Sequence, residues 1–217
     1  MPRSAPRVTQ DQNGRALGPR ALKTRRSLLA ATEELLSSQG VREVSVVEIA
    51  RKAGTSPATF YQYFKDVEDA VLRLAELAAG EMPAVLQLID RPWEGAGGLA
   101  NARAIVDAFV RHWDAHRAVL RVRNLAADEG DLRFLKVRQE AMTPVLGHLA
   151  AQIQAGQRAG RVDAKLHPAA AAAALGAILE RLAAYHRELE SLGVSRDDLV
   201  ETCARILHQT VTGGGAR

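Results

Sequence analysis

Cysteine and long apolar runs are scarce in this chain, and their scarcity excludes several classes of protein. The single cysteine, Cys203, rules out an internal disulfide framework and a cysteine-based zinc or iron–sulfur site. Hydrophobic residues make up 47% of the chain, but no apolar run approaches the roughly 20 residues that span a membrane. Residues 1–21 lack the apolar stretch of a secretory signal. We therefore expect a cytoplasmic protein in which Cys203 is a small core residue.

Motifs of catalysis are also missing. No serine or cysteine stands in a nucleophile elbow, and no glycine-rich phosphate loop is present. His112 and His116 are four residues apart, a spacing that can hold a metal on one helix face, but Trp113 follows where zinc-protease helices have glutamate. No third ligand is evident. We expect ordinary surface or core histidines, and thus no metal, no cofactor and no enzymatic activity, with an enzyme as the weak alternative.

Acidic side chains are almost absent from residues 1–26, where seven basic residues and one aspartate give a net charge of +6. The whole chain carries +4, so residues 27–217 sum to −2. The basic segment has too few apolar residues to fold alone. We predict a disordered basic arm over residues 1–22, which either neutralises nucleic-acid phosphates and enters a minor groove or serves only as a soluble tail.

Aromatic residues form only 4% of the chain, and four of its seven tyrosines and phenylalanines stand together in residues 60–64. Phe60 and Phe64 are four residues apart and share one helix face, so we predict that they plug a small helical core. Tyr61 then points elsewhere, with Thr59 and Gln62 on the outer surface.

Two short helices are predicted around this aromatic segment, after a first helix over residues 24–39. Ser45 followed three residues later by Glu48 is a capping box, in which each side chain satisfies an orphan N–H at the helix start. Ser56 can cap the next helix, with Pro57 at its first position. Only residues 54–56 separate the two helices, a tight glycine-bearing turn typical of a helix-turn-helix.

The remaining sequence has helical apolar spacing, which predicts further amphipathic helices. Asp66 is expected to cap a fourth helix, and Pro144 is expected to kink or break a long later one. The later helices are expected over residues 99–115, 117–127, 131–159, 167–185 and 195–210.

Three segments carry a family likeness: Val44-Ser45-Val46-Val47-Glu48-Ile49-Ala50, Ala53-Gly54-Thr55-Ser56 and Thr59-Phe60-Tyr61-Gln62-Tyr63-Phe64. With their neighbours they make residues 24–74 resemble the DNA-binding domain of the TetR family of bacterial repressors. Residues 109–126 and 174–185 are broadly similar to the branch of that family that contains EthR.

The resemblance implies an all-α fold of about nine helices. It has a three-helix helix-turn-helix DNA-binding domain over residues 23–68 and a helical ligand-binding and dimerisation domain over residues 69–212. It also implies a homodimer, held by the last two helices, that binds double-stranded operator DNA. Carried over by position, the residues implied to contact DNA bases or phosphates are Thr24, Ser45, Thr55, Ser56, Pro57, Ala58, Thr59, Tyr61, Gln62, Tyr63 and Lys65.

The sequence departs from the family pattern at two places. Val67 stands where the family often has a phosphate-contacting lysine, so either Lys65 or the basic arm is expected to supply that charge. Pro57-Ala58 replaces a Lys-Gly pair that often opens the recognition helix.

The family likeness also implies a ligand cavity, which a mostly apolar set of side chains with one amide could line. Because few charged groups lie on these faces, we expect a small lipophilic or acyl-type effector that releases a repressor from its operator. The alternative is a ligand-binding helical protein without specific DNA binding. The expected lining residues are Phe109, Trp113, Leu120, Asn124, Met142, Val145, Leu149 and Leu179.

Overall fold

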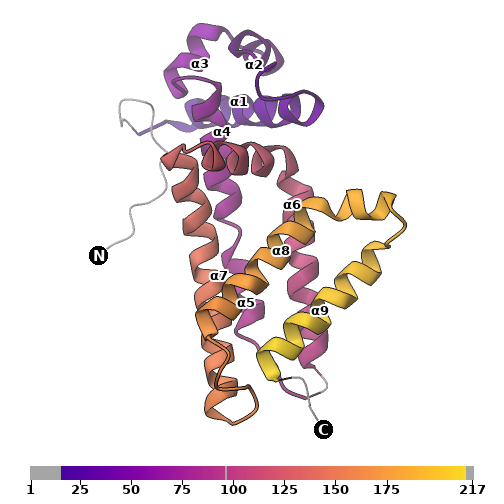
Figure 1. Cartoon of the computed structure of the whole chain (residues 1–217). Helices are drawn as coiled ribbons and strands as arrows, with labels where there is room; N and C mark the ends of the chain where they lie inside the picture. Colours follow the sequence, from indigo (N-terminus) through magenta and orange to yellow (C-terminus); the bar gives the residue numbers. More distant parts are fainter. Residues whose placement is uncertain (1–15, 96, 214–217) are drawn as a thin grey trace. The chain divides into compact units, whose positions relative to one another are not determined.

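The computed structural model describes residues 16–95 and 97–213, whose regular structure is helical and confirms the all-α fold class (Figure 1). These residues form two compact units, one of residues 16–77 with Arg117–Val137 and the other of Ala78–His116 with residues 138–213. None of the helices in this part of the chain combines the length and apolarity that crossing a bilayer requires. The helices are α1 (Pro19–Ser38), α2 (Val46–Lys52), α3 (Pro57–Tyr63), α4 (Val67–Ala79), α5 (Pro83–Ile89), α6 (Gly98–Asp128), α7 (Leu132–Arg158), α8 (Pro168–Ser191) and α9 (Arg196–Thr212).

Helix α1 begins at Pro19, five residues before the predicted start at Thr24. Proline is well suited to the first helical position, because its fixed φ is helical and its missing N–H has no helical partner there. The end of the predicted disordered arm is therefore helical, and assigning residues 19–22 to that arm was wrong. Residues 1–15 of the predicted arm lie outside the described residues.

The predicted caps of α2 and α3 are confirmed. The Ser45 hydroxyl accepts a bond from the Glu48 N–H at 3.2 Å, and the Glu48 carboxylate accepts one from the Ser45 N–H at 3.1 Å. The Ser45 hydroxyl also donates to the Glu48 carboxylate at 2.8 Å, and this bond, together with the one from the Ser45 N–H, lowers the pKa of the Glu48 carboxyl. The Ser56 hydroxyl caps α3 by accepting from Thr59 N–H at 3.2 Å. Between the helices Gly54 has a φ of 66°, which glycine adopts without steric cost.

The aromatic plug is also confirmed. Phe60 and Phe64 are fully buried, and their ring centroids lie 5.3 Å apart. Leu28 of α1 and Ile49 of α2 are equally buried in this unit. Burying one such side chain stabilises a fold by about 1.5–3 kcal/mol, so these four residues account for much of the stability of a small three-helix domain.

The start of α4 was predicted from the sequence, whereas helix α5 was not. The predicted cap of α4 is confirmed, because the Asp66 carboxylate accepts from Asp69 N–H at 2.8 Å. Helix α5 was not predicted, although Pro83 marks its first turn. Side chains that follow α5 in the chain donate hydrogen bonds to the last carbonyls of this helix. Trp93 Nε1 donates to Ile89 O at 2.8 Å, and Asn101 Nδ2 donates to Leu88 O at 2.9 Å.

The two helices expected over residues 99–115 and 117–127 are confirmed, because α6 consists of two helices that meet at a kink at His116, whose backbone angles are not helical (φ −122°, ψ 20°). The division between them thus falls at residue 116, the residue that both expected ranges leave out. Helix α7 continues through Pro144, so a break of the helix there is excluded.

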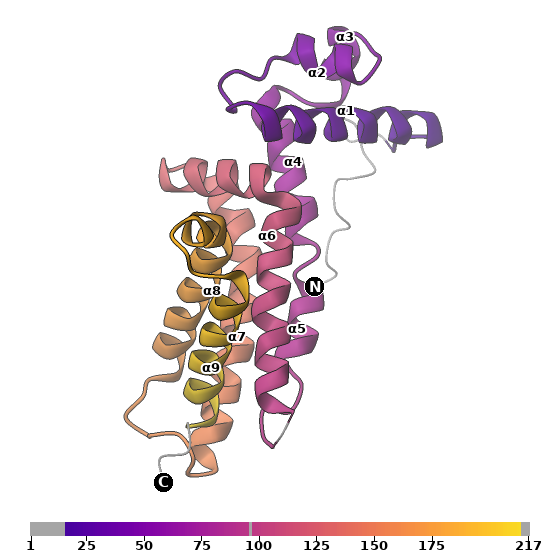
Figure 2. The ribbon, with the colours of Figure 1, turned by 90° about the vertical axis from the view of Figure 1, so that its right-hand side faces the viewer.

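In the second unit α8 and α9 lie side by side, as both views show (Figure 2). Helix α8 comes close to α7 at Gly176, where an added Cβ atom would lie 2.5 Å from the end of the Leu146 side chain. Helix α9 starts at the predicted Ser195 cap, which accepts from Asp198 N–H at 3.1 Å.

Ion pairs join α9 to α6 within this unit. Glu201 of α9 accepts hydrogen bonds from the Arg103 guanidinium of α6, one of them at 3.0 Å, and pairs with Arg205 at 2.6 Å. The hydrogen bond from Arg103 lowers the pKa of the Glu201 carboxyl to about 2, with Arg205 acting in the same direction.

We predict that the ion pair between Arg103 and Glu201 makes the packing of α9 against α6 sensitive to acid. An unfolded glutamate has a pKa of about 4.3, so the stabilisation is complete above about pH 5 and is lost as pH falls towards about 2. The difference in free energy of unfolding between wild type and Glu201→Gln should narrow over that window in urea titrations followed by circular dichroism. Glu190→Gln, at an exposed position on α8, serves as the control. A Glu201→Gln difference that stays constant from pH 6 to pH 3 would contradict the assignment.

Candidate nucleic-acid interface and ligand core

Helix α3 presents a polar and aromatic face to solvent because Phe60 turns inward. Tyr61 is 54% exposed, with its ring edge-on to Phe60 at 5.8 Å between centroids. Gln62 beside it is exposed, as are Pro57 and Ala58 in the first turn. The arrangement supplies a hydroxyl and an amide on a rigid base, with small side chains where the helix begins.

Most of the serine and threonine hydroxyls that were predicted to contact DNA form hydrogen bonds with nearby residues of the chain. The Ser56 and Thr59 hydroxyls lie 3.0 Å apart, and the Ser45 hydroxyl donates to Glu48 at 2.8 Å. Thr24 of α1 donates to the Arg20 carbonyl at 3.2 Å. A hydroxyl retains acceptor capacity when it donates, so these groups can still receive a hydrogen bond, whereas contact with a phosphate oxygen requires them to rotate. Thr55 and Tyr63 are half-buried.

The basic side chains of α1 do not all belong to a nucleic-acid surface. Arg20, Lys23 and Arg26 are exposed, but Arg25 is 4% exposed and its guanidinium lies 5.3 Å from the centroid of the Phe64 ring. Burial lowers the pKa of Arg25, and neighbouring Arg73 lowers it further. Counting Arg25 with the phosphate-neutralising charges of the first 26 residues was therefore wrong. Its helical spacing from Leu28 and Leu29 was the sequence signal for burial.

The start of α4, where Val67 stands in place of the family's phosphate-contacting lysine, is acidic. Val67 is half-buried, and Glu68 and Asp69 occupy the first turn. Arg73 pairs with Asp69 at 3.0 Å, and Arg133 of α7 pairs with Glu68 at 3.4 Å. The helix dipole at this end thus already interacts with carboxylates of the chain itself.

Lys65 precedes this acidic turn. Its backbone N–H donates to Asp69 at 3.1 Å while its side chain is exposed. Exposed Lys65 contrasts with Lys52 of α2, whose ammonium is held 2.6 Å from the Glu34 carboxylate.

The residues expected to line a ligand cavity are mostly buried. They are divided between the two units, since Leu120 and Asn124 belong to the first and the other six to the second. In the first unit the Asn124 amide oxygen accepts a hydrogen bond from buried Arg123 at 3.0 Å. In the second unit Met142 is half-buried, and the buried members of the set are Phe109, Trp113, Val145, Leu149 and Leu179.

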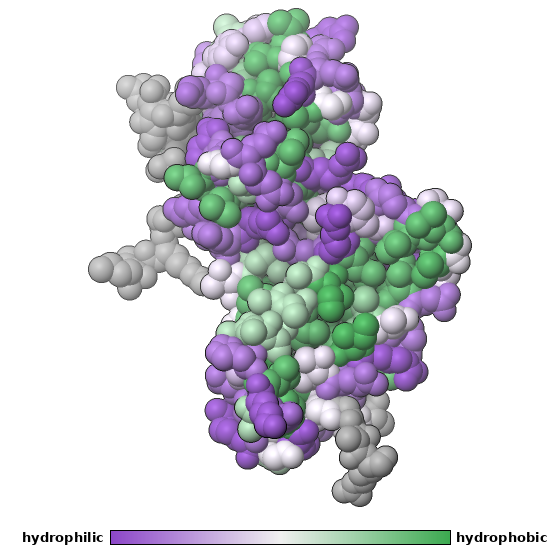
Figure 3. All heavy atoms as spheres, viewed as in Figure 1, coloured by the Kyte–Doolittle hydropathy of each residue, from purple (hydrophilic) through white to green (hydrophobic). Residues whose placement is uncertain are grey.

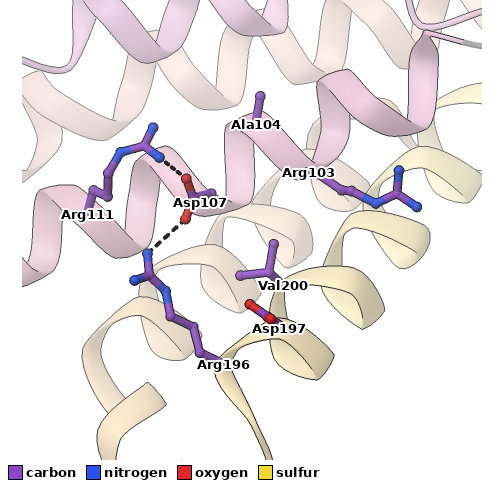
Figure 4. A pocket seen from close by; sticks show the side chains of 7 residues that line it. All are labelled: Arg103, Ala104, Asp107, Arg111, Arg196, Asp197 and Val200. Atoms are coloured by element: carbon purple, nitrogen blue, oxygen red, sulfur yellow. Dashed lines mark hydrogen bonds and ion pairs between the residues drawn. The ribbon is translucent and has the colours of Figure 1, made fainter.

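An open hollow between α6 and α9 has a different chemistry (Figure 4). Asp107 at its centre pairs with Arg196 at 2.8 Å and with Arg111. Its lining contains none of the residues expected to bind the ligand, and its charges would not attract a lipophilic molecule. The lining residues are Arg103, Ala104, Asp107, Arg111, Arg196, Asp197 and Val200.

The structure also supplies a third group beside the paired histidines of α6, which the sequence did not reveal. Glu81, 31 residues before His112 in the chain, places its carboxylate 2.8 Å from His116 Nε2 and 3.7 Å from His112 Nδ1. No third ligand was evident from the sequence, because the residue that could serve as one reaches the histidines only through a turn between α4 and α5.

Comparison with known proteins places both parts of the sequence in related families. Residues 28–73 match the family of bacterial regulatory proteins called the tetR family, and residues 85–216 match the tetracyclin repressor-like C-terminal domain. The chain is 26% identical over 155 residues to the HTH-type transcriptional regulator EthR of Mycobacterium tuberculosis, a match that covers 71% of each chain.

Two solved structures share the fold. FadR of Bacillus subtilis, determined in complex with stearoyl-CoA, is 19% identical and has a TM-score of 0.63, covering 87% of this chain and 98% of its own. SmeT, the repressor of the Stenotrophomonas maltophilia multidrug efflux pump SmeDEF, is 18% identical with a TM-score of 0.58, covering 88% and 91%.

Proposed function

The chain belongs to the TetR family of bacterial regulatory proteins, and we propose that it is a homodimeric repressor released from operator DNA by a lipophilic, acyl-type effector. The observation that carries the proposal is the exposed face of α3, held outward by a fully buried aromatic plug. On this proposal α3 lies in the major groove, where Gln62 and Thr59 reach base edges or nearby phosphates.

Phosphate contacts fix such a helix in its groove. Tyr61 and Tyr63 would donate hydroxyls to phosphate oxygens, and Lys65 would supply the charge that Val67 does not. The paired carboxylates of the α4 start support this role for Lys65, because Arg73 and Arg133 reduce the repulsion between Glu68 or Asp69 and a nearby phosphate. Exposed Arg20, Lys23 and Arg26 of α1 would add sequence-independent attraction.

A homodimer through α8 and α9 is supported by the exposed apolar side chains on these helices. The surface over them is largely hydrophobic in the space-filling view (Figure 3). Ile178 and Tyr185 of α8 are 36% and 41% exposed, and Ile206 of α9 is 40% exposed. Clustered exposed apolar residues mark interaction surfaces. A twofold dimer would present two α3 helices roughly 34–36 Å apart, or a multiple of this, to a near-palindromic operator.

An apolar effector is supported by the buried set around Phe109, Trp113 and Leu149, which offers no charged group to a polar ligand. The fold is shared with a protein solved with stearoyl-CoA. The effector would bind more tightly to a conformer whose recognition helices no longer match the operator spacing. The difference between its affinities for the two conformers would set how far it lowers the affinity for DNA. We propose repression, and not activation, because most members of the family are repressors. The proposal gives the chain no catalytic role and a cytoplasmic site of action.

We predict specific binding to the DNA that flanks the protein's own gene. A mobility-shift assay with excess unrelated competitor DNA at moderate salt should show a retained complex, and Tyr61→Phe should weaken it about tenfold or more by removing one hydroxyl bond to a charged phosphate. Gln154→Ala, which changes an exposed side chain of α7 outside α3 and the proposed dimer surface, should bind as wild type does. Only unspecific, salt-sensitive retention would favour the alternative of a ligand-binding protein without a specific operator.

Lys65 should contribute one counterion-releasing contact in each subunit. We expect Lys65→Gln to flatten the plot of log affinity against log salt concentration by about 0.9 per subunit, roughly 2 for a dimer. Lys52→Gln removes a lysine already paired with Glu34 and is the matched control. An unchanged slope in Lys65→Gln, with a flatter slope after removal of residues 1–15, would assign the missing charge to the arm.

Stearoyl-CoA is the probe for the effector class. Added to the protein–DNA complex, it should lower DNA affinity by about 5- to 150-fold, the usual range of allosteric coupling. Coenzyme A without an acyl chain should have no effect, because it lacks the apolar part. If fatty acyl-CoA thioesters of every chain length leave the shift unchanged while specific DNA binding persists, the acyl-type effector is wrong and the DNA-binding role stands.

A further inference from the structure

Three potential metal ligands converge in the second unit at the end of its α6 segment. The ligand atoms of Glu81, His112 and His116 all lie within 4.8 Å of one another. The two imidazole rings are 5.1 Å apart between centroids. Their side chains are only 10% and 19% exposed, while that of Glu81 is 58% exposed. The group thus has two sheltered nitrogen donors and one carboxylate that faces water.

The backbone of α6 departs from helical geometry at one of these residues. His116 has φ −122° and ψ 20°, whereas the helix is regular on both sides of it. Non-helical angles at a single position re-aim that side chain relative to the one four residues earlier. The distortion therefore bears on the placement of a histidine that belongs to the cluster, and it is independent of the ligand-atom distances.

The spacing of the donor atoms fits a tetrahedral ion. Zinc bonds of 2.0–2.2 Å to nitrogen and oxygen imply neighbouring ligand atoms about 3.4 Å apart. The distances from Glu81 Oε2 to His116 Nε2 and to His112 Nδ1 are 2.8 Å and 3.7 Å, one on each side of that value. Small side-chain rotations would equalise them. Two imidazoles and a carboxylate suit zinc and other divalent first-row transition ions.

We propose that Glu81, His112 and His116 form a binding site for one divalent transition-metal ion, of the Zn²⁺ class, with a fourth position open to solvent. Three protein ligands with an open position is an established zinc arrangement. The ion would join the turn after α4 to α6 at the residue where α6 is distorted. The proposal does not depend on DNA binding.

The other histidines provide a contrast. His208 contacts the Trp93 carbonyl at 3.1 Å, and His167 caps α8. Buried His186 contacts the Ala183 carbonyl at 2.9 Å. His148 is 2.6 Å from the Asp90 carboxylate, and within the described residues this pair is not part of any group of three potential ligands. A histidine–carboxylate pair therefore also occurs in this protein outside the proposed site, and it is the matched control.

Cobalt is the most direct probe, because four-coordinate Co²⁺ gives visible absorption bands that the hydrated ion lacks. Full-length protein, freed of metal by dialysis against a chelator, should develop these bands on titration with Co²⁺ and saturate at one ion per chain. Zn²⁺ should then abolish the bands by displacement, as expected from its tighter binding. Absence of a saturable spectrum together with absence of stoichiometric Zn²⁺ binding in calorimetry would overturn the proposal without any variant.

Variants then locate the site. His112→Asn and His116→Asn should each weaken Zn²⁺ binding by at least about tenfold, since loss of even an outer-shell partner costs that much. His148→Asn should bind as wild type does. Far-UV circular dichroism identifies any variant that fails to fold, and Glu81→Gln, at an exposed carboxylate, tests the same site without disturbing the packing of α6. The assignment would be overturned if the His112, His116 and Glu81 variants bound Zn²⁺ as tightly as wild type. It would also be overturned if His148→Asn weakened Zn²⁺ binding as much as these variants do.

Discussion

Burial of Phe60 and Phe64 is the constraint on which the DNA-binding unit depends. Both rings are fully buried, and Arg25 of α1 lies over the Phe64 ring. With one face of α3 fixed in this way, the helix has only one set of side chains left for solvent, and Tyr61 and Gln62 belong to it. The chain has few other aromatic residues. Four of the aromatic residues lie in or next to α3, a helix of only seven residues that buried rings hold in place.

Charge around this plug is balanced by ion pairs within α4 and between α4 and α7. Burial of Arg25 disfavours its cation, but Asp69 and Glu76 favour it and also pair with Arg73. Glu76 and Asp69 hold the pKa of Arg73 above its ordinary value, although burial opposes them. Arg133 of α7 adds a further partner at the start of α4. The acidic first turn of α4 is thus part of the framework of this unit, and Lys65, between α3 and α4 in the chain, has an exposed side chain.

The sequence revealed those features that depend on residues close together in the chain. The caps at Ser45, Ser56, Asp66 and Ser195 each involve a residue three positions later, so a local pattern was sufficient. The family likeness is likewise local. The approach of Glu81 to His116 spans 35 residues and depends on a turn that no short pattern encodes. The expected ligand-lining residues share apolarity with ordinary core residues, so composition could not separate a cavity from a packed interior.

The central claim is that two copies of α3 read the major groove of one operator. Methylation interference tests it directly, because guanine N7 lies in the major groove and its methylation blocks contact there. The account predicts two symmetric clusters of interfering guanines, with centres one helical turn of roughly 34–36 Å or a multiple of it apart. A protein that binds the same DNA with no interference at guanine N7, or with one unpaired cluster, would contradict it.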